Sequence, residues 1–170
     1  MKSRRVFRSL SAAALVAVAL FGLVSCGYGK GKMSDQELTV FATRYSSAWS
    51  SQDPDRLALL YGEDGRLQIN AGEPAVGRAA IAAKASEFMT AFPNMMVEMV
   101  AVGRDEEHVI FEWRWTGTNT GPGGTGRQVE ITGYEEWTFG PDGLIVESKG
   151  HFDEAEYQRQ MGVDEREESE

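Results

Sequence analysis

The hydrophobic residues of the chain follow two different periods, one up to about residue 92 and another after it. In the first part, apolar residues recur every three or four positions, which is the spacing of one helix face. Helices are predicted over residues 34–49, 53–62 and 78–92, and a short one over 153–162. In the second part, apolar and polar residues alternate, as in half-buried strands. Strands are predicted over residues 66–70, 94–104, 108–120, 127–139 and 144–152.

Local signals support these boundaries. Ser34 and Glu37 form the pattern of a capping box, and Asp53 followed by Pro54 is typical of a helix start. The residues 63–65, Glu-Asp-Gly, predict a turn before the first strand. Because most helices precede most strands, we expect one α+β domain with the helices packed on one face of a curved sheet.

One carboxylate interrupts the apolar face of the strand predicted over 127–139. That face carries Val129, Ile131, Gly133, Glu135, Trp137 and Phe139. A carboxylate removed from water costs several kcal/mol unless it is paired or protonated. Glu135 therefore faces a pocket, or pairs with an arginine such as Arg44 or Arg78, or is turned outward by a bulge. We expect it to face a pocket.

The preceding strand places two indole rings on one face. Val109, Phe111, Trp113 and Trp115 alternate with polar residues there. Buried indole N–H groups require hydrogen-bond partners, and ligand pockets are largely apolar with few polar groups. The pattern fits an ordinary core as well as the wall of a ligand pocket.

The first residues have the features of a secretion signal. Four basic residues lie within the first eight, an apolar run follows from Leu10 to Val24, and the sequence Leu-Val-Ser-Cys ends at Cys26, the single cysteine. This resembles the lipobox of bacterial lipoproteins, which implies cleavage before Cys26 and attachment of lipid to its thiol. We expect residues 1–25 to be a signal peptide, 26–33 a lipidated tether, 34–162 the α+β domain and 163–170 a disordered acidic tail. The expected location is the cell envelope, on the periplasmic face of an outer membrane, or the outer face of the cell membrane where no outer membrane exists.

The composition excludes several functions. The chain has 26 acidic and 17 basic residues, and four of the basic ones lie in the signal, so no nucleic-acid partner is expected. One cysteine and two histidines make a metal site improbable. No phosphate-binding loop or nucleophile motif is present in the sequence, and no cofactor is expected.

Several segments, in order, resemble the SnoaL-like polyketide cyclase family of the nuclear transport factor 2-like superfamily, which includes the ketosteroid isomerases. They are RYSSAWSSQDPDRLALLYGEDGRLQIN, GEPAVGRAAI, WTGTNTGPGGTGRQVEITGYEEWTF, DGLIVES and YQRQMG. The resemblance implies a cone-shaped, curved mixed or antiparallel sheet packed against three N-terminal helices, with a short C-terminal helix.

The resemblance also suggests site residues. Tyr45 matches an oxyanion-stabilising tyrosine of the isomerases, and Glu135 matches a protonated acid beside it. The position of the isomerase base falls at residues 68–70, Gln-Ile-Asn, where no carboxylate stands, so an isomerase of the known design is not expected. The predicted ligand-binding residues are Trp49, Asn70, Phe111, Trp113 and Trp137.

The acid/base aspartate of the cyclases aligns with Gly150, which leaves His151 and Asp153 as candidates. Asp153 also fits a helix cap, because Glu156 follows three residues later. An imidazole suits proton transfer near neutral pH, but a lone histidine is more often structural.

Two functions remain open at this point. The first is cofactor-free acid/base catalysis on a hydrophobic carbonyl compound by Tyr45, Glu135 and either Asp153 or His151. The second is a membrane-anchored module that binds an apolar molecule or a partner protein without catalysis. The superfamily resemblance also suggests a homodimer.

Overall fold

The computed structural model describes residues 32–105 and 108–162. The predicted signal peptide, the predicted lipidation site Cys26, most of the predicted tether and the predicted acidic tail lie outside these residues. No helix within the described ranges combines the length and apolar character needed to cross a membrane.

Four helices form where the sequence predicts them, with different lengths. They are α1 (Asp35–Trp49), α2 (Pro54–Ala58), α3 (Arg78–Ala91) and α4 (Glu154–Met161). The Ser34 side chain accepts from the backbone N–H of Glu37, whose carboxylate accepts from the Ser34 backbone, so the predicted capping box is present. At the start of α2, the Asp53 side chain accepts from the backbone N–H of Arg56, and Pro54 is the first helical residue. These caps satisfy amide groups that have no partner inside a helix.

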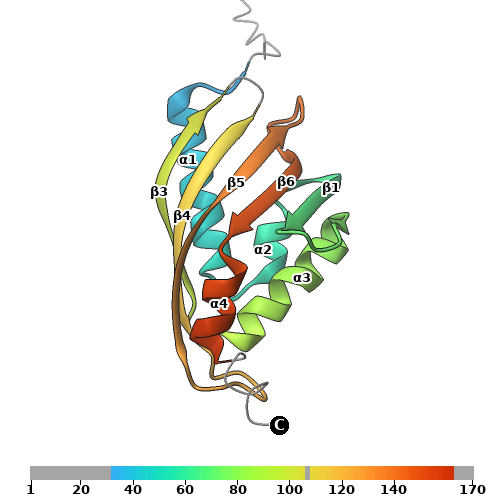
Figure 1. The fold of residues 1–170 in the computed structure, drawn as a ribbon. Helices are drawn as coiled ribbons and strands as arrows, with labels where there is room; N and C mark the ends of the chain where they lie inside the picture. Colours follow the sequence, from blue (N-terminus) through green and yellow to red (C-terminus); the bar gives the residue numbers. More distant parts are fainter. Residues whose placement is uncertain (1–31, 106–107, 163–170) are drawn as a thin grey trace, which may run out of the picture. The chain divides into compact units, whose positions relative to one another are not determined.

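Six strands form one open, mixed sheet. The strands are β1 (Tyr61–Ile69), β2 (Ala75–Val76), β3 (Met96–Arg104), β4 (Val109–Thr118), β5 (Gln128–Phe139) and β6 (Ile145–Phe152). Their order in the sheet is β2-β1-β6-β5-β4-β3 (Figure 1). β1 and β6 are parallel, whereas the other neighbours are antiparallel. The α+β class with a mixed sheet is therefore confirmed.

Three details differ from the prediction. The second helix ends at Ala58, and Tyr61 already belongs to β1. The predicted turn at residues 63–65 is wrong, because β1 runs through it with an irregular pairing between Tyr61 and Arg66. Residues Ala75 and Val76, which lie outside the predicted helices and strands, form the short edge strand β2. Edge pairing and a bulge depend on a neighbouring strand, and local composition does not reveal that strand.

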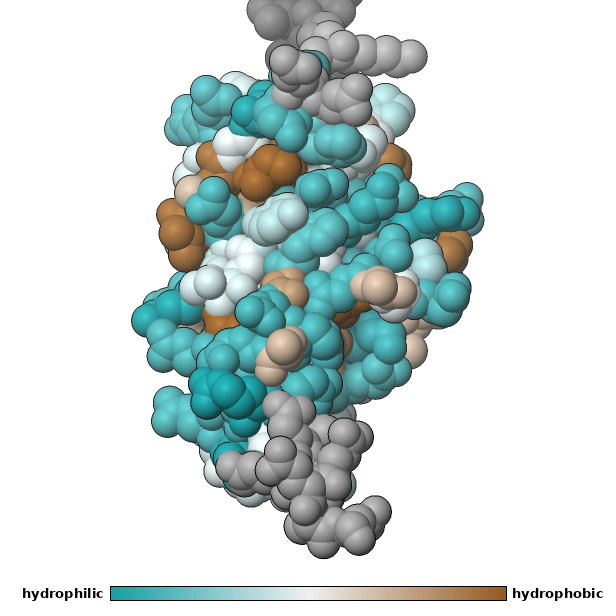
Figure 2. Space-filling view, in the orientation of Figure 1, coloured by the Kyte–Doolittle hydropathy of each residue, from teal (hydrophilic) through white to brown (hydrophobic). Residues whose placement is uncertain are grey.

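The helices and the inner face of the sheet enclose the hydrophobic core. The rings of Phe111 on β4 and Trp137 on β5 stack 4.6 Å apart, and Tyr45 from α1 packs edge-on against Trp137 at 4.8 Å. In Figure 1, α1 and α3 lie along the same side of the sheet. Figure 2 shows the view of Figure 1 covered mostly by hydrophilic residues, with hydrophobic ones in separate patches.

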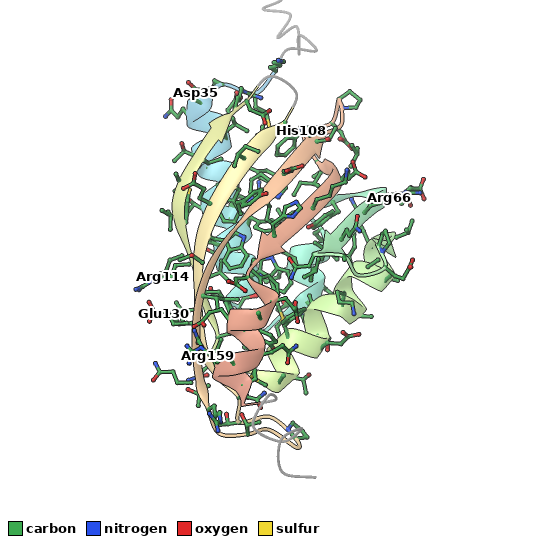
Figure 3. All side chains as sticks on the ribbon, viewed as in Figure 1. Asp35, Arg66, His108, Arg114, Glu130 and Arg159 are labelled. Atoms are coloured by element: carbon green, nitrogen blue, oxygen red, sulfur yellow. The ribbon has the colours of Figure 1, made fainter. Side chains whose placement is uncertain are left out.

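The opposite face of the sheet is polar where β4 and β5 pair. Arg114 on β4 forms ion pairs with Glu98 on β3 at 2.6 Å and with Glu130 on β5 at 3.2 Å. Figure 3 shows Arg114 and Glu130 pointing away from the sheet. The alternation along β4 therefore sends Arg114 outward while its neighbours Trp113 and Trp115 face the core.

Candidate functional site

A cavity of about 70 Å³ lies between the inner face of the sheet and the helices. Its wall combines residues of α1, α3, α4 and five strands. Eight of the 14 lining residues are aromatic: Tyr45, Trp49, Phe88, Phe111, Trp113, Trp115, Phe152 and Tyr157. Of the described residues that line the cavity, Glu135 alone has an ionisable carboxyl group, and none is basic.

Glu135 is held in the wall by the register of three strands. It lies on β5, opposite Phe111 of β4 and Gly150 of β6. A side chain at position 150 would place its Cβ 3.6 Å from Oε1 of Glu135, in van der Waals contact with the carboxyl group. Gly150 therefore lies directly beside the Glu135 carboxyl. The side chain is 6% exposed.

Three hydroxyl groups surround this carboxyl. The Tyr45 hydroxyl donates to Oε1 at 3.1 Å, and the Ser148 hydroxyl donates to Oε2. The hydroxyl groups of Tyr45 and Tyr61 lie 2.9 Å apart, and since Tyr45 donates to Glu135, Tyr61 donates to Tyr45. All three partners are completely buried. Two donated hydrogen bonds compensate part of the cost of removing the carboxyl from water.

Burial nevertheless dominates the titration of Glu135. Removal from water raises its pKa from 4.5 to about 7, while the hydrogen bonds from Ser148 and Tyr45 act in the opposite direction. The nearby indole of Trp137 also lowers the pKa, although its N–H makes no hydrogen bond of normal geometry within the described residues. Burial and the adjacent carboxyl raise the pKa of both Tyr45 and Tyr61. Both phenols therefore stay neutral while Glu135 titrates near neutral pH.

The structure decides between the alternatives for Glu135. The carboxyl points inward and, within residues 32–105 and 108–162, makes none of the observed ion pairs. Arg78 donates instead to the backbone carbonyl of Tyr61 at 2.8 Å, and Arg44 is exposed. The pairing of β5 with β4 is regular around Glu135, so no bulge turns it outward.

Tyr45 is in contact with Glu135, as predicted, but its hydroxyl is enclosed. The residue has 0% exposure, and its oxygen is occupied by Glu135 and Tyr61. In this arrangement, Tyr45 orients the carboxyl and does not present its own hydroxyl to the cavity. Glu135 is the polar group of the pair that retains residual exposure.

His151 and Asp153 lie away from the cavity. His151 follows Gly150 on β6 and faces the opposite side of the sheet, where its ring stacks on Tyr134 at 4.7 Å. Its Nε2 lies 3.7 Å from a carboxylate oxygen of Glu136. Asp153 caps α4, accepting from the backbone N–H of Glu156 at 3.0 Å. The structure therefore does not bring either residue to Glu135.

The predicted ligand-binding residues divide into two groups. Trp49, Phe111 and Trp113 line the cavity. Trp137 lies behind Phe111 and is 1% exposed, so it supports the wall from outside. Asn70 has a positive φ of 47° and accepts from the backbone N–H of Phe152 at 3.0 Å, which ties the end of β1 to the end of β6.

Tyr61 and Ser148 belong to the site although no sequence pattern predicted them there. Ser148 lies two positions before Gly150 on the same strand, so the period of two could have placed it on the inner face. Tyr61 gave no such signal, because it fell in a predicted helix. Its position depends on the parallel pairing of β1 with β6.

In the part of the chain that the structure describes, no three histidine, cysteine, aspartate or glutamate side chains come together to form a metal site.

Three buried indole N–H groups have no hydrogen-bond partner among the described residues: those of Trp113, Trp115 and Trp137. The first two belong to rings that line the cavity.

Comparisons with solved structures support the fold. A protein from Catenulispora acidiphila with a ketosteroid isomerase-like fold, solved with trimethylamine, is 21% identical over 72% of this chain and 92% of its own, with a TM-score of 0.63. A protein from Jannaschia sp. assigned as a SnoaL-like polyketide cyclase is 19% identical over 78% of this chain and 98% of its own, with a TM-score of 0.67. AclR from Streptomyces galilaeus, assigned as a hydroxylase, is 22% identical over 76% and 83%, with a TM-score of 0.64. At these identities the likeness establishes the fold alone.

The family follows from the sequence itself. No curated protein matches the chain. The model of the SnoaL-like domain matches residues 42–148, which run from α1 to β6 and include both Tyr45 and Glu135. The chain therefore belongs to the SnoaL-like domain family.

Proposed function

We propose that this domain binds a small apolar carbonyl compound in the cavity and that Glu135 exchanges a proton with it. The observation that carries the proposal is a buried carboxyl, without an ion-pair partner among the described residues, in the wall of an apolar cavity. A carboxyl kept neutral by burial can donate a hydrogen bond to a carbonyl oxygen. Perturbed acids of this kind occur preferentially at functional sites.

The cavity volume limits the ligand. The volume of about 70 Å³ compares with about 30 Å³ for one water molecule in the liquid, so the cavity holds only a small group. A small ketone such as butanone could place its carbonyl end there. A fused ring system of steroid dimensions does not fit, so a larger ligand would insert only one end.

Glu135 would act as both acid and base. Its pKa of about 7 lets it hold or release a proton near neutral pH, which is the requirement for general acid–base catalysis. Tyr45 and Ser148 fix the orientation of the carboxyl. Because His151 and Asp153 lie elsewhere, we propose that the same carboxyl removes a proton beside the carbonyl and returns it.

Binding is tested by calorimetric titration with butanone at about pH 6 and pH 8. We expect tighter binding to the wild-type protein at pH 6, because the protonated acid donates the hydrogen bond. The Glu135→Gln variant keeps a donor at every pH, so its affinity should not change between the two pH values. Equal wild-type affinities for butanone at both pH values would show that Glu135 does not take part in binding.

Catalysis is tested without knowledge of the natural substrate. Exchange of the protons beside the butanone carbonyl in deuterated water reports proton abstraction directly. The wild-type protein should accelerate this exchange, and Glu135→Gln should not. Binding without accelerated exchange would select the alternative function, a ligand-binding module without catalysis.

We also propose that lipid on Cys26 anchors the domain in the cell envelope, after removal of residues 1–25. The support is the basic start, the apolar run and the Leu-Val-Ser-Cys sequence. Labelling with a palmitate analogue should modify the wild-type protein and not Cys26→Ser, and the variant should leave the membrane fraction. Membrane retention of unlabelled Cys26→Ser would contradict the proposal.

A homodimer through the outer face of the sheet is a separate proposal. β3 is an edge strand of the sheet, and its residues Val100 and Met96 are 61% and 52% exposed. Glu98, which pairs with Arg114, lies on the same strand. Analytical ultracentrifugation would show a dimer in the wild-type protein and a monomer after Val100→Lys. A monomer at all concentrations would refute it.

A further inference from the structure

We propose that the same cavity takes a second class of ligand, a small alkylated ammonium cation, with ionised Glu135 as its counter-ion. This inference rests on the proposed ligand-binding role of the cavity but not on a carbonyl compound as ligand. Three properties of the wall support it: its rings, its charge and its size.

The wall is far more aromatic than burial of an apolar molecule requires. Aromatic side chains make up 10% of the chain but eight of the 14 residues that line the cavity. Trp49 from α1, Trp113 and Trp115 from β4, and Tyr157 from α4 come from different elements and converge on one space. Aromatic faces carry negative potential, and cages of such rings recognise alkylated ammonium groups.

The indole N–H groups do not oppose a cation. The Nε1 atoms of Trp113 and Trp115 are covered by surrounding atoms, although their rings line the cavity. The rings, and not their N–H dipoles, therefore contribute the accessible part of the wall. Aliphatic side chains would supply the same apolar surface without attracting positive charge.

The described residues of the cavity wall include one carboxyl group and no cationic group. Both oxygens of Glu135 accept a hydrogen bond, from Tyr45 and from Ser148, which is the pattern that stabilises an ionised carboxylate. Within the described residues, no lysine, arginine or histidine lines the cavity to balance this charge. A bound cation would supply the missing counter-charge and remove part of the cost of burying the carboxylate.

The size of the cavity fits a compact cation. The cavity of about 70 Å³ is small, and tetramethylammonium, with five non-hydrogen atoms, is the smallest tetraalkylated ammonium cation. Such a cation has no N–H group and donates no hydrogen bonds to water, so it loses none when it enters an apolar cavity. A long-chain amine or a lysine side chain with its ammonium group would lose hydrogen bonds to water.

Among the described residues, Glu135 is the one group near the ligand that changes charge around neutral pH. The titratable groups that face Glu135 are Tyr45 from α1 and Tyr61 from β1, and burial raises the pKa of both phenols. Tyr157 from α4 also lines the cavity, and burial raises its pKa as well. Ser148 from β6 does not titrate, and His151 lies on the other face of the sheet. The permanent charge of tetramethylammonium does not titrate either, so any pH dependence reports Glu135.

The test is calorimetric titration of the purified full-length protein with tetramethylammonium chloride at about pH 8 and pH 6. With a pKa of about 7, Glu135 is mostly ionised at pH 8 and mostly protonated at pH 6. Affinity should therefore be about tenfold weaker at pH 6, opposite in direction to the carbonyl compound. The neutral comparison is tert-butanol, which also has five non-hydrogen atoms, and sodium chloride controls for ionic strength. We expect tert-butanol to bind more weakly and without pH dependence.

Two variants distinguish an effect of the Glu135 charge from a general effect of a glutamate-to-glutamine change on the protein. Glu135→Gln should lose tetramethylammonium binding, because the amide carries no charge at any pH. Glu112→Gln, the same change at an exposed position of β4, should bind tetramethylammonium and butanone as the wild-type protein does. Should Glu135→Gln fail to fold, the wild-type pH comparison decides alone.

Two results would overturn the inference. One is tert-butanol binding as tightly as tetramethylammonium, and the other is no tetramethylammonium binding at either pH. If butanone binds in the second case, the carbonyl proposal stands and the cation proposal falls. If neither ligand binds, both proposals fall together.

Discussion

The pH dependence of stability gives the most direct test of the buried carboxyl. In the unfolded chain, Glu135 regains its ordinary pKa of 4.5, whereas burial raises the pKa to about 7 in the folded protein. Between these values, the folded state binds more protons than the unfolded state. The free energy of unfolding therefore decreases as the pH rises through this window. The contribution is largest below pH 4.5 and is lost above pH 7.

The magnitude follows from the two pKa values. At about 1.4 kcal/mol per pH unit, ionisation of buried Glu135 costs the folded state about 3 kcal/mol. Most of this change falls between pH 5 and pH 8. Because the side chain of Glu135 is only 6% exposed, solvent screening reduces the figure little.

Urea denaturation of the wild-type protein and of Glu135→Gln at about pH 5 and pH 8 measures this cost. Glutamine has nearly the same shape and does not ionise, so the difference between the two proteins cancels the other titrating groups. We expect the stability difference to shift by about 2–3 kcal/mol in favour of the glutamine variant as the pH rises. Glu112→Gln, at an exposed position, should show no such shift. Parallel stability curves for wild type and Glu135→Gln would refute a buried, neutral acid.

Three further substitutions test other parts of the site. Ser148→Ala removes a donor to Glu135, so the pKa of Glu135 should rise above about 7, as measured by NMR titration of its carboxyl carbon; an unchanged or lower pKa would contradict the hydrogen bond. Gly133→Ala would drive a Cβ into the ring of Trp113 and a backbone oxygen, so thermal unfolding should show a loss of about 1–3 kcal/mol or more. Asp153→Ala should cost about 1 kcal/mol of stability through loss of the α4 cap, with proton exchange of butanone unchanged; a loss of exchange without loss of stability would make Asp153 an acid/base group.

Much of the architecture was accessible from local patterns. The capping box at Ser34 and Glu37, and the alternation over β4 and β5, depend on neighbouring residues in the chain and appear as predicted. The inward direction of Glu135 follows from the same alternation, because a strand has a period of two. Local patterns failed where a neighbour distant in sequence decides the structure, as at Tyr61 and in the edge strand β2.

The sequence by itself determined the α+β class, the family resemblance and the presence of one carboxylate on an apolar strand face. Only the tertiary structure decided that this carboxylate meets Tyr45, Tyr61 and Ser148, and that His151 and Asp153 do not join it. The physical reason is range. Hydrophobic periodicity and helix caps act over a few residues, whereas the pKa of a buried acid depends on which distant groups the strand register brings within hydrogen-bonding distance.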